Sequence, residues 1–201
     1  SGYDQFGNQT LSVDFGIFEN GDRTAFNDER ATTTEYALNL DAWMLRHPKR
    51  QEIKSLNGAV ISRAEFFYDD ETFSGNNAGI VSLGNLTLKR EWMAPSNSTA
   101  FINASRGKHD PYGNPILLLD PLAVAPAGVV DFSKGHAREI AYDNRFRTYP
   151  ARETLHIGNG AQPLVFQADY DEAFGTLIGT TDFNDHATSY IYDTLARLTS
   201  I

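Results

Sequence analysis

The residues of this chain that could bind a metal or transfer a proton are few and widely spaced. No two of its five histidines lie three to five residues apart, so the sequence holds no helical zinc-binding pair. It has no Gly-x-Ser-x-Gly nucleophile motif and no glycine-rich phosphate loop. Because cysteine is absent, thiolate nucleophiles, disulfides and Cys-ligated metals are excluded. We therefore expect no catalytic residue, no bound metal and no cofactor, although distant strands could still assemble a histidine site.

Acidic residues gather in three groups that could offer oxygen ligands to calcium. None has the spacing of an EF-hand loop, so acids solvated in turns are the favoured interpretation. Among 26 acidic residues some pair will also suit glycoside hydrolysis, but sequence does not give the carboxylate separation on which that reaction depends. Calcium binding and a carboxylate-based enzyme therefore stay as alternatives. The groups are residues 69–71 beside Asn76 and Asn77, residues 169–172, and Asp182 with Asp185.

Positive charge is concentrated in one stretch of an otherwise acidic chain. Arginine side chains can grip an anion or a neighbouring subunit's acids. Pairing with nearby acids such as Glu139 and Glu153 is the favoured interpretation, and contact with a partner is the alternative. The basic residues are Lys134, Arg138, Arg145, Arg147 and Arg152.

The net charge of −9 opposes general or sequence-specific nucleic-acid binding and docking on anionic lipid. No apolar run approaches the roughly 20 residues needed to span a bilayer, so we expect no membrane insertion. Asn-x-Ser/Thr sequons would be glycan sites in a secreted eukaryotic protein. We place the chain in a virion or an extracellular surface assembly. The sequons begin at Asn8, Asn85, Asn97 and Asn103.

The elements that position these residues show mainly the period of two that is typical of strands. Leu11 to Ile17 and Leu86 to Trp92 alternate in this way, and Asn57-Gly58 indicates a hairpin turn. Two stretches have helical features, residues 96–106 with Ser96 as a possible cap and residues 182–198. We find no internal repeat. We predict a single mainly β domain over residues 1–201, an antiparallel sandwich or barrel with one to three short peripheral helices.

The segment Gly-Asn-Leu-Thr-Leu-Lys-Arg at residues 84–90 resembles a segment of the tail-tube proteins of contractile bacteriophages and related injection machines. In that family a similar strand leads into a short helix and then an apolar strand, and residues 96–106 and 116–119 follow here in that order. The family usually continues with glycine, whereas Glu91 and Trp92 stand here. The resemblance implies a β-sandwich subunit that forms hexameric rings stacked into a tube.

Our leading hypothesis is a non-catalytic structural subunit of a virion, tail tube or filament. Its partners would be further copies of itself and other structural proteins of the assembly. The first alternative is an extracellular β-sandwich that binds carbohydrate or another ligand, with or without calcium, and the second is a glycan-active enzyme. Candidate subunit contacts are Lys89, Glu91, Arg145 and Arg147.

Charge reversal at Lys89 tests the assembly hypothesis. The alternation from Leu86 to Trp92 predicts that Leu86 and Leu88 pack inward while Thr87, Lys89 and Glu91 face solvent or a neighbour. Lys89→Glu should then leave the subunit folded, because a surface change usually costs less than about 0.5 kcal/mol. It should weaken assembly, because a like-charge contact at an interface costs several kcal/mol. Native mass measured beside thermal melting separates the two effects, and a mutant that assembles like the wild type would remove the role given to Lys89.

Overall fold

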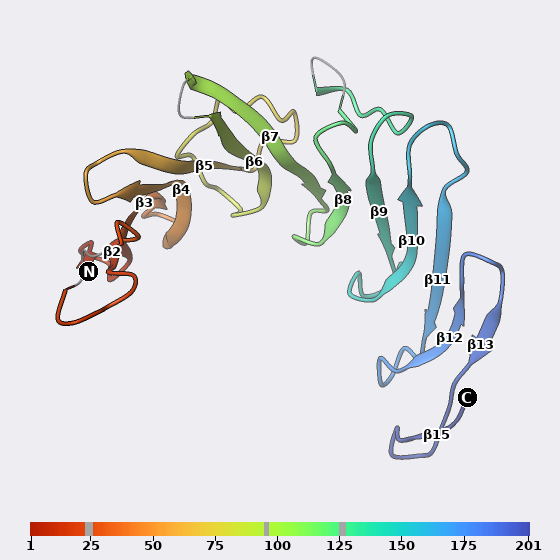
Figure 1. Ribbon diagram of the computed structural model, residues 1–201. Coiled ribbons are helices and arrows are strands. Elements are labelled where there is room, and N and C mark those ends of the chain that lie inside the picture. The colour runs from red at the N-terminus through yellow and green to blue at the C-terminus, as the bar shows by residue number, and fades with distance from the viewer. Residues whose placement is uncertain (23–25, 95–96, 125–127) are drawn as a thin grey trace. The chain divides into compact units, whose positions relative to one another are not determined.

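The computed structural model describes residues 1–22, 26–94, 97–124 and 128–201 (Figure 1). Its contacts divide the chain into two compact units, residues 1–106 and 107–201. Ser96 and the side chain of Asn97, a predicted cap and a predicted glycan site, lie outside the described residues. The prediction of one domain over residues 1–201 stays a prediction.

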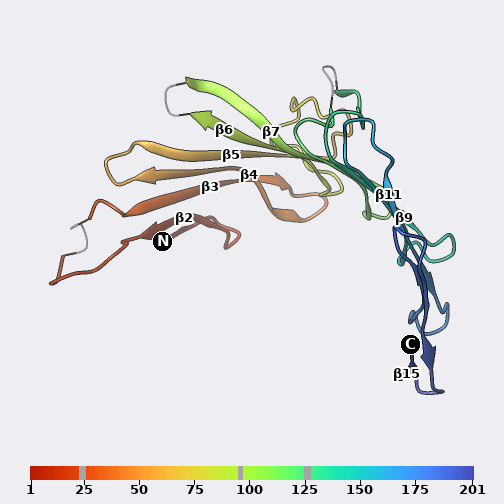
Figure 2. The same cartoon turned by 45° about the vertical axis from the view of Figure 1, so that its right-hand side comes forward.

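Unit 1 is an antiparallel meander in which each strand pairs with the next one along the chain (Figure 2). The turn at Asn57-Gly58 joins two of its strands, as the sequence predicted. Its strands are β1 (Gly2–Tyr3), β2 (Gln9–Asp14), β3 (Arg30–Asn39), β4 (Met44–Ser55), β5 (Val60–Tyr68), β6 (Leu86–Ala94) and β7 (Asn97–His109).

Unit 2 repeats this arrangement, again with antiparallel pairing between successive strands. A separate two-stranded ribbon ends the chain. The strands are β8 (Pro115–Leu119), β9 (Ala137–Tyr142), β10 (Pro150–His156), β11 (Leu164–Tyr170), β12 (Leu177–Thr181) and β13 (Ala187–Ser189), followed by β14 (Ile191–Tyr192) and β15 (Leu198–Ser200).

The prediction of a mainly β, antiparallel protein is confirmed, but two of its details are wrong. Strands β1 to β13 form one sheet that follows chain order and is not closed into a barrel, in place of the expected sandwich or barrel. The described residues contain no α-helix, and within them no helix has the length and hydropathy needed to cross a bilayer. The expected helix at 96–106 is part of β7, where Asn103 pairs with Arg90 of β6.

A turn replaces the expected C-terminal helix. Ile191, Leu195 and Leu198 have helical spacing, but the carboxylate of Asp193 accepts the N–H groups of Leu195 and Arg197 at 2.9 and 3.0 Å. An Asp side chain that captures the N–H groups of its own turn competes with helix formation. The sequence pattern therefore matched a helix by coincidence.

The turn at Asp193 belongs to a recurring five-residue type. In the copy at Asp110, the carboxylate accepts the N–H groups of Tyr112 and Asn114, both at 2.9 Å. The backbone N–H of Asp110 donates to the carbonyl of Asn114, and the N–H of Gly113 donates to the carbonyl of Asp110. The same four bonds occur in the turns that begin at Asp4, Asp110, Asp182 and Asp193.

These turns are an internal repeat that the sequence analysis missed. Their sequences, Asp-Gln-Phe-Gly-Asn, Asp-Pro-Tyr-Gly-Asn, Asp-Phe-Asn-Asp-His and Asp-Thr-Leu-Ala-Arg, share only the first residue throughout. What the four copies share is a backbone shape, with a positive φ at the fourth residue. That residue is Gly7 at 81°, Gly113 at 87°, Asp185 at 62° and Ala196 at 58°.

Two substitutions at the fourth turn position should change the free energy of unfolding in opposite directions. A non-glycine residue in the left-handed region costs about 1–2 kcal/mol. Gly113→Ala should therefore lower the free energy of unfolding by about 1 kcal/mol. Ala196→Gly should raise the free energy of unfolding, either of the whole chain or of the C-terminal ribbon alone. Urea denaturation of both variants checks this. Unchanged stability in Gly113→Ala, or a loss in Ala196→Gly, would contradict the shared turn geometry.

Candidate functional site

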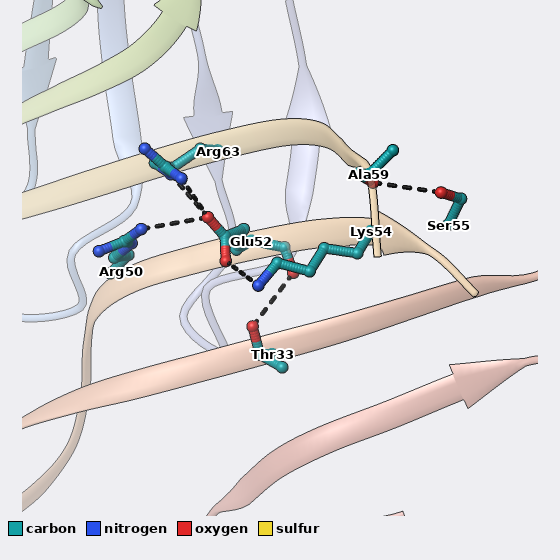
Figure 3. Close-up of polar contacts among 7 residues, drawn as sticks. All are labelled: Thr33, Arg50, Glu52, Lys54, Ser55, Ala59 and Arg63. Carbon is teal, nitrogen blue, oxygen red and sulfur yellow. Dashed lines mark hydrogen bonds and ion pairs between the residues drawn. The ribbon is translucent and has the colours of Figure 1, made fainter. Parts of the chain in front are cut away.

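The most concentrated charge in unit 1 surrounds one buried carboxylate on β4 (Figure 3). Glu52 is 8% exposed. Arg50 and Lys54 lie two residues before and after Glu52, and therefore on the same face of β4. Arg63 of β5 lies directly opposite Glu52 in the strand register. We call these four residues the Glu52 cluster.

Both carboxylate oxygens of Glu52 are occupied. Oε1 accepts the Arg63 Nε–H at 2.8 Å and an Arg50 guanidinium N–H at 3.1 Å, and Oε2 contacts Lys54 Nζ at 2.8 Å. The backbone carbonyl of Glu52 accepts the Thr33 hydroxyl of β3 at 3.4 Å. The Glu52 cluster therefore joins β4 to β5, and the Thr33 hydrogen bond joins β4 to β3.

The surroundings of Glu52 keep its carboxylate ionised. Burial acts to raise its pKa, but hydrogen bonds from Lys54, Arg63 and Arg50 outweigh that effect and lower the pKa from 4.5 to about 2. Such a group donates no proton near neutral pH, so it is a poor general acid, and with both oxygens engaged it is a poor nucleophile. The chemistry that the arrangement supports best is structural ion pairing.

The sequence analysis missed this cluster. Arg-Gln-Glu-Ile-Lys at residues 50–54 places charged residues on one strand face at period two, which was the available signal. The register that brings Arg63 opposite Glu52 depends on pairing between strands and could not be read from the sequence.

The predicted contact residues Lys89 and Glu91 both lie on β6, where they pair with each other. Lys89 Nζ lies 2.5 Å from Glu91 Oε1, and the two side chains are 34% and 46% exposed. The neighbouring prediction for Thr87 is wrong, since Thr87 is 2% exposed and donates its hydroxyl to the Phe67 carbonyl at 3.1 Å. Of the two leucines expected to pack inward, Leu88 is buried and Leu86 is exposed.

The predicted contact residues Arg145 and Arg147 share the turn between β9 and β10. Arg145 forms an ion pair with Glu172. The backbone of Arg147 has φ of 55°, and its carbonyl accepts the Asn114 side-chain amide at 2.6 Å. Among the described residues the Arg147 guanidinium has no ion pair. Whether any of the four predicted residues contacts a partner stays a prediction.

The acidic group at residues 69–71 is built into its own loop. One Asp69 oxygen accepts the N–H groups of Ser82 and Leu83 at 2.7 and 2.9 Å, and the other accepts that of Asn85 at 2.9 Å. Asp70 similarly accepts bonds from residues 72, 74 and 75. In the part of the chain that the structure describes, no three His, Asp or Glu residues are grouped so as to hold a metal ion.

Comparison with known proteins assigns no family to this chain. No protein-family model matches it, and no curated protein matches it. Among solved structures that match, the crystal structure of TcdB2-TccC3 has a TM-score of 0.30 and 12% sequence identity. The match covers 86% of this chain but only 10% of that one. At this TM-score the likeness carries no argument about fold or function.

Substitution of Glu52 tests the structural role of the cluster. Because the pKa of Glu52 is lowered, the stability that this carboxylate adds to the fold is complete above a pH of about 4.5 and is lost as pH falls toward 2. The shift corresponds to roughly 3 kcal/mol. Glu52→Gln should lower the free energy of unfolding by about 2 kcal/mol at pH 7 and reduce its dependence on pH below 4.5.

Urea denaturation at several pH values gives this comparison. Glu65→Gln is the matched control, because Glu65 lies opposite Arg50 on β5 but has no ion pair within the described residues. Equal losses of unfolding free energy in the two variants would show that the Glu52 cluster adds no more stability than a carboxylate without an ion pair.

Proposed function

We propose that this chain is a non-catalytic structural component of a larger assembly. The observation that carries the proposal is its exposed area of 12655 Å². A compact protein of 22.3 kDa exposes about 9,400 Å², and two separate compact halves would expose about 11,300 Å². The exposed area exceeds both values.

Large apolar side chains contribute to this exposed area. In unit 2, Phe166 is 41% and Phe183 is 58% exposed, and both line an apolar concavity of about 340 Å³ with Leu155, Leu164 and Val165. Exposed aromatic side chains gathered around a concavity are a candidate surface for contact with another protein. A neighbouring subunit or another structural protein of the same assembly would cover it.

The polar groups of the chain also suit a structural role. Histidines contact carboxylates, as in the 2.6 Å approach of His156 Nε2 to Glu139 Oε2. Within the described residues none of these histidines also bonds a Ser or Thr hydroxyl, so no charge-relay arrangement is built there. Catalysis by a carboxylate pair, which needs no such relay, remains the third hypothesis.

The resemblance at residues 84–90 extends the proposal to a tail-tube-like or other virion assembly, with further copies of the chain as partners. An extracellular ligand-binding module is the second candidate. It is favoured by a separate observation in unit 2, a concavity lined by arginine residues without ion pairs.

Native mass tests the proposed assembly. The wild type should form species of discrete mass above 22.3 kDa as its concentration rises, because association covers apolar surface. Phe183→Ser should shift that transition to higher concentration. Leu122→Ser, which changes a residue that is 67% exposed but does not line the apolar concavity, is the control. A wild type that stays monomeric throughout light-scattering measurements would contradict the proposal, and polydisperse aggregation would not support it.

A further inference from the structure

A second concavity in unit 2 has a different chemical character. Its volume is about 640 Å³, and residues of β9, β10 and the turns at Asp110 and Asp143 line it. Arg147 comes from one of these turns and Arg152 from β10. Both arginines are exposed, so their side chains are open to a ligand from solvent.

The acids that line this concavity are already engaged. The two oxygens of Asp110 accept bonds from Tyr112 and Asn114, including the Asn114 side-chain amide at 3.0 Å. Glu139 Oε2 lies 2.6 Å from His156 Nε2, whose ring stacks on Phe132 at a centroid distance of 3.9 Å. Neither acid forms a direct ion pair with an arginine, although the charge of Arg147 acts on Asp110.

The two arginines lack such partners. Among the described residues neither Arg147 nor Arg152 has an ion pair or a side-chain hydrogen bond, although the chain carries 26 acids against 17 basic residues. By contrast, the other three arginines of unit 2 are paired, Arg138 with Glu153, Arg145 with Glu172 and Arg197 with Asp193. The concavity therefore presents two guanidinium groups without a direct ion pair, beside the two carboxylates of Asp110 and Glu139.

Additional donors lie in the same concavity. The Thr154 hydroxyl and the Asn144 amide both line it and have no hydrogen-bond partner within the described residues. Guanidinium groups match carboxylate and phosphate oxygens with paired N–H donors, and neutral donors add orientation. Ile116 and Ala141 supply apolar lining beside these polar groups.

We propose that this concavity binds the oxyanion of a small ligand, a carboxylate or a phosphate, through Arg147 and Arg152. Thr154 and Asn144 donate further hydrogen bonds to the bound group. Glu139 contacts His156, and Asp110 accepts hydrogen bonds within its own turn, so neither carboxylate forms a direct ion pair with the two arginines. All of the site's residues lie in unit 2 of one chain, so it is complete without a second copy.

Calorimetric titration tests the site with two probes, citrate for the carboxylate and inorganic phosphate for the phosphate, at constant ionic strength. The wild type should bind at least one probe saturably, and the probe that binds identifies the oxyanion. Arg152→Gln and Arg147→Gln should each weaken binding roughly tenfold, because charge-assisted hydrogen bonds are about twice as strong as neutral ones.

Arg46→Gln is the matched control, since it removes the same charge from an exposed position in unit 1. It should bind like the wild type. Urea denaturation should show all three variants folded, because neither site arginine is paired within the described residues. Absence of saturable binding of both probes to the wild type, or equal affinity in Arg152→Gln and Arg46→Gln, would overturn the proposal.

Discussion

The interaction on which the structure depends is the hydrogen bond from a turn's backbone N–H groups to an aspartate carboxylate. A sheet whose strands follow chain order must reverse direction after every strand, and each reversal leaves backbone donors without a ladder partner. At Asp4, Asp110, Asp182 and Asp193 the same carboxylate geometry satisfies two of those donors. The Asp69 carboxylate accepts backbone N–H groups in the same way within a longer loop. Much of the acidic character of the chain therefore serves the turns, and it requires neither a metal nor a catalytic role.

The Glu52 cluster supplies the corresponding constraint within the strands. Turns fix the ends of a hairpin, but a slip of one residue in register would move every side chain to the opposite face. Arg50 and Lys54 lie on the same strand as Glu52, but Arg63 lies on β5, so a slipped register between β4 and β5 would remove the Arg63 partner from the buried carboxylate. Loss of one member of a buried ion pair is strongly destabilising. The cluster thus favours one register in a sheet with little apolar core.

The sequence predicted the strand content because period-two patterns and Asn-Gly turns are local signals. Residues 86–92 and the turn at Asn57-Gly58 are found where they were expected. The helix expected at 182–198 failed because Asp193 forms a turn, which overrides the spacing of three apolar residues. The predicted sandwich was wrong because the number of sheet layers depends on contacts between strands that are distant in the sequence. Arg147 and Arg152 were visible as part of a basic stretch, but their lack of acidic partners follows from side-chain geometry.

The exposed apolar surface connects this fold to its proposed role, because a sheet held by turn carboxylates and cross-strand ions can leave apolar side chains free for partners. The turns are central to this fold, and amide hydrogen exchange resolved by residue tests them most directly. The N–H groups of Tyr112 and Asn114, which donate to Asp110, should exchange well below the rate of unstructured peptide at neutral pH. Their exchange should accelerate in Asp110→Ala. Exchange at the unstructured rate in the wild type would contradict the account.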